Sequence, residues 1–500
     1  MNREVELKFE LGPDGPGSIE RVPTLKAASR QEQDQRTVYY DTPGGKLRKR
    51  GFSLRVRKTP SGFVQTLKPL TPGAGLFARD EWETEVATID PEVRALARTP
   101  LADLADGKRI KKLIPVVTSE MRRTSWLLNE PDSSLQLDLD QGLIEGGGRE
   151  QTVAELEIEV RRGDPGAAAR LARAISNATP LRIGVLSKAE RGFALASGAA
   201  AKVRKAEPVS VDTRMSVAEG FAAIVSACLR HYRLNEPLVI AETDPAALHQ
   251  SRVAMRRLRS ALTLFKPVVS DADFPRLRQE LRWFTNHLGD ARNLDVYLAG
   301  GMIETGRAQL EAKRERAYRT VIRTMNSKRL RTLLLDLVLW ASLGQWRSGV
   351  KSIGALPRYA VKRVDKLWGG IEAAGERLAI MDEDSRHRLR IEVKKMRYAL
   401  EFFRALFRSE AEDQERFADS IEDLQESLGG LNDIVTARRF AMHDEAGDQR
   451  QERRLVRQAE RAFRRLVEIG PYWQRAAWPL FTTGMKRRPR TVSPAWLEKP

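Results

Sequence analysis

Charged residues alternate with apolar ones at the start of this 500-residue sequence, where Glu4, Glu6 and Lys8 occupy every second position of the segment EVELKF. Successive side chains of a strand point to opposite sides, so these three charged groups would share one face. Carboxylates gathered on one face can hold a hard divalent cation, and lysine or arginine can hold phosphate oxygens. The pattern indicates metal and phosphate chemistry if other strands repeat it.

Four further segments within the first two hundred residues repeat the alternation. A single strand of this kind often simply exposes its polar face to water. Several like charges on one strand repel one another, however, and mixed signs would serve solubility better. Five such strands favour a closed antiparallel barrel whose apolar faces pack against outer helices and whose charged faces meet in a wet tunnel. The repeated polar positions are Arg55 and Arg57; Glu81, Glu83 and Glu85; Gln136, Asp138 and Asp140; and Glu155, Glu157 and Glu159.

The ordered set of these segments resembles the CYTH domain, a family also called the triphosphate tunnel metalloenzymes. The resemblance covers about residues 1–200. It is carried by E-x-E-x-K, TVYYDTPGGKLRKRGFSLRVRK, RDEWE, Arg123, LDLD, ELEIE and the SKAERG segment around Lys188. The resemblance implies an acid anhydride hydrolase that acts on a triphosphate with Mg2+ or Mn2+ as cofactor.

The expected roles of the tunnel residues follow from this resemblance and from the needs of phosphoryl transfer. That reaction requires alignment, neutralised phosphate charge and an activated water. One metal ion would bridge the phosphates, and a second could activate the water. The expected metal ligands are Glu4, Glu6, Glu155, Glu157 and Glu159, with the choice among the last three left open. The expected substrate-binding residues are Arg55, Arg57, Lys68, Arg123 and Lys188. The catalytic set is Glu4, Glu6, Lys8, Glu81 and Glu83, in which Lys8 helps to cradle the triphosphate and Glu81 or Glu83 orients the bases or joins the metal shell.

Composition bounds the class of protein. A content of 41% apolar and 31% charged residues suits two or three packed domains. The single cysteine, Cys228, excludes an intramolecular disulfide and a cysteine-rich zinc site. The first residues are charged and lack an apolar core, so we expect no signal peptide. The longest apolar stretch, LLLDLVLWASLGQW, contains Asp336 and predicts a buried helix rather than a membrane span.

The net charge of +19 lies mostly in the second part of the chain. Residues 1–200 contain 31 basic and 28 acidic residues, whereas residues 201–500 contain 55 and 39. Such an excess favours a polyanionic partner. The small-residue stretch ALASGAAAKVRKAEPVSVD separates the two parts, and after it the apolar residues repeat with the 3.6-residue period of helices.

The helical part contains an internal repeat, HQSRVAMRRLRSALTLF and HRLRIEVKKMRYALEFF. Each copy places a base three, seven and ten residues after its histidine, so the four side chains lie within about 80° of a helix circumference. One helix of this kind is usually a solvated face, but two copies at identical spacing favour anion binding. The first cationic stripe is His249, Arg252, Arg256 and Arg259, and the second cationic stripe is His387, Arg390, Lys394 and Arg397. The residues opposite them are Met255, Leu258, Leu262 and Phe265, and Val393, Met396, Leu400 and Phe403.

About forty residues after each histidine come the related segments LGDARNLDV and LGGLNDIV. Together with the two stripes, they resemble a CHAD domain over about residues 213–485. The resemblance implies two pseudo-symmetric four-helix bundles that bind inorganic polyphosphate. Lys394 and Lys395 replace arginines of the family pattern, which keeps the charge and loses the bidentate fork.

The predicted fold is an α+β antiparallel β-tunnel barrel with flanking helices, followed by an all-α domain of two repeated four-helix bundles. The expected limits are residues 1–200 for the tunnel domain, 201–212 for a linker, 213–485 for the helical domain with repeats at about 213–345 and 346–485, and 486–500 for a basic, disordered tail.

The leading hypothesis is a metal-dependent triphosphatase that hydrolyses inorganic triphosphate or a related short triphosphate and carries a polyphosphate-binding domain. The same tunnel could instead cyclise ATP or accept thiamine triphosphate or an RNA 5′ end. A non-catalytic polyphosphate-binding or granule-targeting protein is the alternative from another class, although phosphate binding alone gains nothing from the tunnel carboxylates. We expect a cytoplasmic protein with no specific nucleic-acid partner and no membrane insertion. Association with polyphosphate granules and the oligomeric state are left open.

Overall fold

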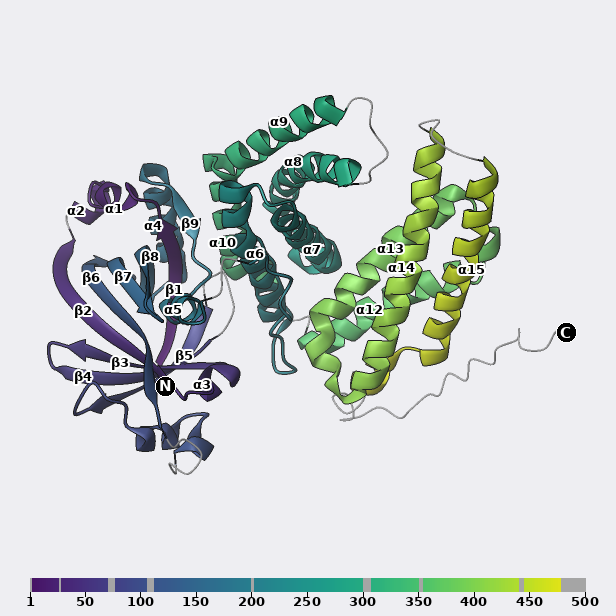
Figure 1. The fold of residues 1–500 in the computed structure, drawn as a ribbon. Coiled ribbons are helices and arrows are strands. Elements are labelled where there is room, and N and C mark those ends of the chain that lie inside the picture. The colour runs from purple at the N-terminus through teal and green to yellow at the C-terminus, as the bar shows by residue number, and fades with distance from the viewer. Residues whose placement is uncertain are drawn as a thin grey trace. The chain divides into compact units, whose positions relative to one another are not determined.

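The five alternating segments form strands β1, β3, β5, β7 and β8 of one antiparallel sheet, which has nine strands in the described part of the chain (Figure 1). This computed structural model describes residues 2–26, 28–70, 77–105, 112–198, 202–299, 307–349, 354–439 and 445–477. The order of the strands is β5-β4-β3-β2-β6-β7-β8-β1-β9. They are β1 (Asn2–Leu11), β2 (Ser29–Asp41), β3 (Phe52–Thr59), β4 (Gly62–Pro69), β5 (Phe77–Val86), β6 (Ile114–Glu130), β7 (Ser133–Gly146), β8 (Arg149–Gly163) and β9 (Leu181–Ile183).

Strand β1 joins the two ends of this order. Residues 6–10 of β1 pair with β8, residues 2–6 pair with β5, and residues 9–11 pair with β9. The pairing of β1 with β5 therefore runs along only the first part of β1. The predicted antiparallel sheet followed by an all-helical region is confirmed, while a tunnel barrel closed over its full height stays a prediction.

One face of the sheet is apolar and buried, as the alternation predicts. Leu137, Leu156 and Ile158 are fully buried. Because strand side chains alternate, the acidic residues between them project to the opposite face. Helix α4 (Pro165–Ala178) packs against β7 and β8, and helix α5 (Lys188–Ala196) packs against β6, β7 and β8. Short helices α1 (Gly15–Ile19), α2 (Pro23–Lys26) and α3 (Lys46–Lys49) lie in the connections.

Helix α5 begins with a capping box that fixes where its first residue lies. The Ser187 hydroxyl accepts a hydrogen bond from the Glu190 amide, and the Glu190 carboxylate accepts one from the Ser187 amide. These two bonds satisfy amides that would otherwise lack partners at the helix start. Lys188 is consequently held at the first helical position, beside the sheet.

Residues beyond the sheet are helical wherever the structure describes regular elements. The long helices of the first repeat are α6 (Val217–Glu242), α7 (Pro245–Val269), α8 (Phe274–Ala299), α9 (Arg307–Met325) and α10 (Lys328–Leu343). Those of the second are α12 (Leu356–Gly375), α13 (Glu383–Phe403), α14 (Ala411–Arg439) and α15 (Glu445–Ile469), with the short helices α11 (Trp346–Gly349) and α16 (Tyr472–Ala477) at the ends of the repeats.

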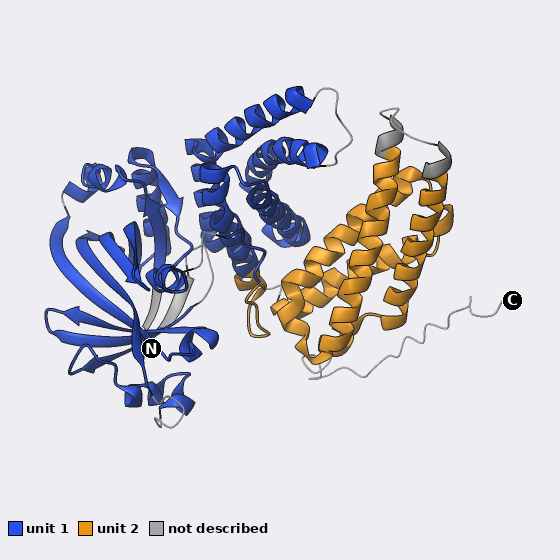
Figure 2. Cartoon of the chain, in the orientation of Figure 1, with its two compact units in different colours: residues 1–207, 221–350 blue, residues 208–220, 351–500 orange. Residues whose placement is uncertain are grey.

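Contacts divide the chain into two compact units (Figure 2). One contains residues 1–207 and 221–350, and the other contains residues 208–220 and 351–500. The sheet and the first helical repeat thus belong to one unit. The domain limits predicted near residues 200 and 213 stay predictions, and the tail predicted at 486–500 lies outside the described residues.

The apolar residues predicted in the helical repeats are buried. Met255, Leu258 and Phe265 of α7 are fully buried, as are Val393 and Met396 of α13. Helix α10, which contains the longest apolar stretch, is buried along most of its length, including Asp336. Within the described ranges, no helix has the length and apolar character needed to cross a membrane.

The contact between α5 and β6 depends on Gly192. A Cβ at this position would lie 2.1 Å from Cγ1 of the buried Val117. We expect Gly192→Ala to lower the free energy of unfolding by about 1–3 kcal/mol, because the helix or the strand must shift. Urea unfolding measures the difference. The control Gly369→Ala in α12 has no atom within 4 Å of the new Cβ and should stabilise by up to about 1 kcal/mol. Equal effects of the two substitutions would contradict the close contact.

Candidate functional site

A cavity of about 690 Å³ lies among the charged faces of the strands. Its lining is mostly charged and polar, and it contains basic and acidic side chains in similar numbers. Nearly all of the predicted tunnel residues line it: Glu6, Lys8, Arg55, Arg57, Lys68, Glu81, Glu83, Arg123, Glu157, Glu159 and Lys188. The side chain of the predicted ligand Glu4 lies outside the described part of the structure.

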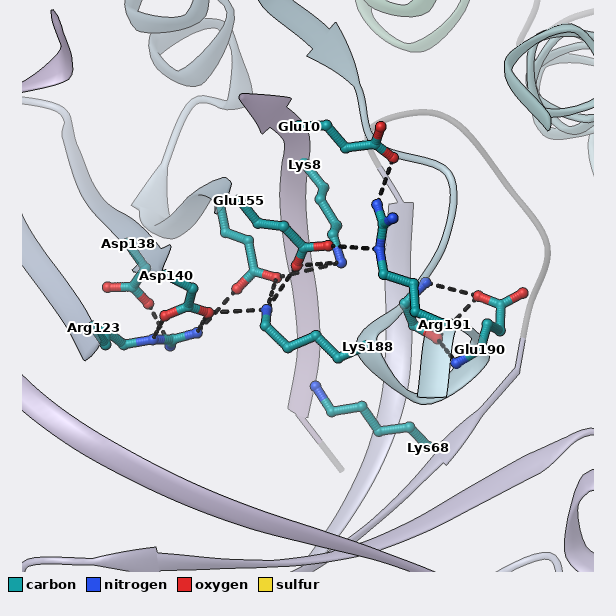
Figure 3. Close-up of polar contacts among 12 residues, drawn as sticks. Lys8, Glu10, Lys68, Arg123, Asp138, Asp140, Glu155, Lys188, Glu190 and Arg191 are labelled. Atoms are coloured by element: carbon teal, nitrogen blue, oxygen red, sulfur yellow. Dashed lines mark hydrogen bonds and ion pairs between the residues drawn. The ribbon is translucent and has the colours of Figure 1, made fainter. Parts of the chain in front are cut away.

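Glu155, the remaining predicted metal ligand, lies beneath this cavity and is 1% exposed. Its carboxylate contacts Nζ of Lys188 at 2.7 Å, Nζ of Lys8 at 2.9 Å and Nε of Arg191 at 3.3 Å (Figure 3). Burial alone would raise the pKa of Glu155, but Lys188, Lys8 and Arg191 lower it below its ordinary value. Glu155 therefore serves as the counter-ion of three bases, an arrangement that favours a structural role over metal binding.

A second carboxylate group holds Arg123 at one side of the cavity. The guanidinium of Arg123 donates to both oxygens of Asp140, at 2.7 and 2.6 Å, and to Asp138 at 2.7 Å. Burial would raise the pKa of Asp140, but Lys188 and Arg123 lower it to about 2. Arg123 and Lys188 are thus fixed in place before any ligand binds.

Arg55 and Arg57 differ from the other cavity bases in their surroundings. Nε of Arg57 donates to the Thr37 hydroxyl at 3.3 Å, and no carboxylate among the described residues lies within ion-pair distance of either arginine. Arg55, burial and Arg123 together lower the pKa of Arg57 to about 10. An anion bound here would relieve the repulsion between these arginines.

The acidic side of the cavity contains Glu6 and Glu159. These residues are direct partners on the antiparallel strands β1 and β8, and both line the cavity. Glu159 also forms an ion pair with Arg161 at 3.1 Å. The carboxylate oxygens of Glu6 and Glu159 are the donors that Mg2+ and Mn2+ take. Among the residues that the structure describes, no group of three or more His, Cys, Asp or Glu side chains is arranged as a metal site. Carboxylate donors of this kind fit a divalent ion. Glu4 lies two residues from Glu6 on the same strand, and the sequence predicts it as a third donor.

Glu81 and Glu83 contact groups on the neighbouring strand β4. Glu81 forms an ion pair with Lys68, and Glu83 accepts a hydrogen bond from the Thr66 hydroxyl at 3.2 Å. The pairing of Glu81 with Lys68 agrees with the predicted role of orienting a base.

The site includes residues to which the sequence analysis gave no role, although Gln136, Asp138 and Asp140 were among the polar positions expected to face the tunnel. Gln136, Asp138 and Arg161 line the cavity, Asp140 accepts from the lining base Arg123, and Arg191 donates to Glu155. A signal existed for the aspartates, because LDLD follows the same alternation as the other strands. Arg191 lies three residues after Lys188, so the sequence places both on the same side of α5. Only the fold shows that Glu155 accepts hydrogen bonds from both side chains.

Two residues of the first cationic stripe donate to neutral groups of α8. Arg252 donates to the Asn293 side chain at 3.5 Å, and Arg259 donates to the Thr285 hydroxyl at 3.4 Å. Burial, Arg256 and Arg292 lower the pKa of Arg252, which marks a surplus of positive charge. The α8 residues that contribute to this surplus, and that sequence analysis missed, are Arg278, Arg282 and Arg292.

The second cationic stripe has the same kind of neighbours. A ring nitrogen of His387 lies 3.1 Å from the Asn432 side chain, and Arg397 donates to Gln425 at 3.0 Å, both on α14. Asn432 is the fourth residue after Leu428, and the residue at that position after Leu288 is Arg292. The two stripes therefore share their geometry, but the first has an additional base.

Comparison with known families accounts for both parts of the chain. Residues 2–193 match the CYTH domain, and residues 223–442 match the CHAD domain. The chain is therefore a CYTH domain followed by a CHAD domain.

Individual relatives show the extent of the similarity. An inorganic triphosphatase of Haemophilus influenzae is 27% identical over 203 residues, which are 39% of this chain and 56% of the relative, so the chain spans little more than half of its length. The CHAD domain of Ricinus communis is 30% identical in sequence to this chain. The match covers 56% of this chain and 97% of the Ricinus chain, with a TM-score of 0.43. A putative adenylyl cyclase from Hippeastrum, described as having a dominant triphosphatase activity, is 19% identical in sequence. The match covers 39% of this chain and 96% of the Hippeastrum chain, with a TM-score of 0.29.

The lowered pKa of Arg57 predicts a trade between stability and binding. The folded chain binds the guanidinium proton of Arg57 more weakly than the unfolded chain does. The charge of Arg57 therefore destabilises the fold below about pH 10, and this destabilisation decreases as the pH rises above that value. We expect Arg57→Gln to raise the free energy of unfolding by about 0.5–2 kcal/mol in anion-free buffer at pH 7. The same substitution should weaken tripolyphosphate binding.

Urea unfolding with and without tripolyphosphate tests both effects. Arg36→Gln is a control on the same sheet, since Arg36 is exposed and lies 3.7 Å from Glu120. It should change the free energy of unfolding by less than about 0.5 kcal/mol. A loss of stability in Arg57→Gln without anion would contradict the account of the arginine pair.

Proposed function

We propose that the CYTH domain hydrolyses inorganic triphosphate with the help of a divalent metal ion. The observation behind this proposal is the division of charge within one cavity. Lys8, Arg123 and Lys188 already have carboxylate partners, whereas Arg55 and Arg57 line the cavity with no carboxylate of the described residues within ion-pair distance. A triphosphate would supply the missing negative charge. The similarity to an inorganic triphosphatase supports the same substrate.

The lining favours a compact anion over a nucleotide or thiamine triphosphate. Its described residues include one aromatic, Tyr39, which is almost fully buried in the wall. Nucleobases and other flat rings are usually bound against apolar and aromatic surfaces. ATP cyclisation and thiamine triphosphate hydrolysis are therefore less well supported than hydrolysis of the inorganic substrate.

The cavity residues would divide the work as follows. Arg55 and Arg57 would bind phosphate oxygens through charge-assisted hydrogen bonds. Arg123 and Lys188 would present charge at positions already fixed by Asp140 and Glu155, so little reorganisation is needed when negative charge develops on the leaving phosphate. A Mg2+ or Mn2+ ion held by Glu4, Glu6 and Glu159 would polarise phosphate oxygens and lower the pKa of a bound water. Glu157 lies within 3.9 Å of Lys8, Arg123 and Lys188 and, like Glu155, would serve these bases as a counter-ion.

Substitution of the carboxylates distinguishes the residues proposed to bind metal from those that support the fold. Glu6→Gln and Glu159→Gln remove charge that lines the cavity, so we expect tripolyphosphate hydrolysis to fall at least about a hundred-fold at limiting metal, with little change in melting temperature. Glu155→Gln removes the buried carboxylate that Lys8, Lys188 and Arg191 share, and leaves their charges to the more distant or more exposed partners Glu157, Asp140 and Glu10. It should cost on the order of 3–5 kcal/mol of stability.

Phosphate release and thermal unfolding of the three variants provide the readout. Wild-type turnover in Glu6→Gln and Glu159→Gln at limiting Mn2+ would refute the proposed metal site. An unchanged melting temperature in Glu155→Gln would show that this carboxylate does not hold the network together.

For the CHAD domain, we propose that the two cationic stripes bind long-chain inorganic polyphosphate. Arg252, Arg259 and Arg397 donate to neutral amide or hydroxyl groups, and His387 contacts another. The surplus of positive charge around Arg252 favours a polyanion as the ligand. The described stripe residues include no aromatic side chain on which a nucleobase could stack, which favours polyphosphate over nucleic acid.

Charge reversal in the full-length chain tests the stripes. Arg256→Glu combined with Lys394→Glu should weaken binding of long-chain polyphosphate at least about a hundred-fold, and the remaining binding should depend less steeply on salt. The matched control is Arg316→Glu with Arg464→Glu, which makes the same charge change at exposed sites on α9 and α15. Equal losses in both variants, or single-stranded RNA binding as tight as polyphosphate binding, would show a general basic surface instead.

A further inference from the structure

Helix α6 of the CHAD domain contacts the segment of the CYTH domain that carries Lys188. This part of α6 and the CYTH domain belong to the same compact unit. Arg230 of α6 is buried, donates to the Val185 carbonyl, and donates to Glu190 at 2.8 Å and Glu207 at 2.9 Å. Two of its three partners thus lie within three residues of Lys188.

Arg233 lies one turn further along α6 and also contacts the CYTH domain. Its Nε donates to the Ile183 carbonyl at 2.9 Å, and an Nη donates to Glu10 at 2.7 Å. The other oxygen of Glu10 accepts from Arg191 at 2.7 Å, and Arg191 in turn donates to Glu155 at 3.3 Å. Arg233 is therefore linked to Glu155, the counter-ion of Lys188, through three successive ion pairs.

These contacts bear on the geometry of α5 because Glu190 has two functions. One of its oxygens closes the capping box at Ser187, and the other accepts from Arg230. Lys188 follows the cap directly, and its amine lies 2.7 Å from Glu155 and 2.9 Å from Asp140. A shift of the cap would displace this amine within the cavity.

We propose that Arg230 and Arg233 are positioning residues for Lys188, so that the CHAD domain completes the substrate site of the CYTH domain. The two arginines hold the backbone at Ile183 and Val185, the cap at Glu190 and the pair formed by Glu10 and Arg191. Neither arginine lines the cavity. This inference rests on the proposed function, because it assigns Lys188 to triphosphate binding.

Another ion pair of this unit provides a matched control. Arg173 of α4 contacts Asp336 of α10, and Asp336 also accepts from Arg276 at 2.8 Å. This contact joins the same two domains, but none of its residues lines the cavity or touches Lys188. Loss of Arg173 therefore reports on domain attachment alone.

The test is a double-mutant cycle on tripolyphosphate binding by the full chain, measured by calorimetry in EDTA. Arg230→Gln should raise the dissociation constant about ten- to a hundred-fold, as expected when a charged ligand group is displaced by about 1 Å. In a Lys188→Gln background, the same change should have less than about a two-fold effect, because the group that it positions is gone. Arg173→Gln should leave the dissociation constant within about two-fold. Arg230→Lys, which keeps a charge toward Glu190, should recover part of the loss.

Equal factors for Arg230→Gln in both backgrounds would show a general structural role and overturn the inference. If that variant does not fold, Glu190→Gln replaces it, since glutamine preserves the capping box and removes the charge facing Arg230. Absence of tripolyphosphate binding by the unsubstituted chain would also overturn the inference. Binding without phosphate release after addition of Mg2+ or Mn2+ would contradict the proposed hydrolysis and leave the positioning role in place.

Discussion

The ion pairs of the buried Glu155 carboxylate are the interaction on which the rest of the site depends. They join bases from β1 and α5 to strand β8, and Arg191 extends the network to Glu10 and to α6. A buried charge without partners costs several kcal/mol, so each base in this network stabilises the position of the others. The fold thereby holds Lys8 and Lys188 at the wall of the cavity before any ligand arrives.

This constraint explains why the cavity has two kinds of basic residue. The bases near Glu155 and Asp140 are paired and fixed. Lys188 stays protonated although it is buried, because the neighbouring carboxylates raise its pKa well above the ordinary value. Arg55 and Arg57 repel each other and have no ion-pair partner among the described side chains, so an anionic ligand would offset this repulsion. A rigid charged wall beside an uncompensated pair is the arrangement expected of a site preorganised for a highly charged anion.

The resemblance to a CYTH domain, rather than periodicity, supplied Lys68, Arg123 and Lys188. Local periodicity predicted five strands of the sheet, the helical repeats and the cavity residues on those strands, because a two-residue or 3.6-residue period decides which side chains share a face. It could not separate Glu155, Glu157 and Glu159, which are equivalent by alternation. The register separates them: Glu155 is opposite Glu10 and Asp140, whereas Glu159 is opposite Glu6 at the acidic side of the cavity. The additional bases on α8 and the contacts of α6 come from packing between distant segments, for which the sequence has no local signal.

The most direct test of the central claim is a crystal structure of the chain with tripolyphosphate and Mn2+. The anomalous signal of manganese locates the metal independently of the anion. Our account predicts manganese at Glu6 and Glu159, phosphate oxygens within hydrogen-bonding distance of Arg55 and Arg57, and Glu155 still paired with Lys8 and Lys188. Manganese bound to Glu155, or a tripolyphosphate that leaves Arg55 and Arg57 without contact, would contradict it.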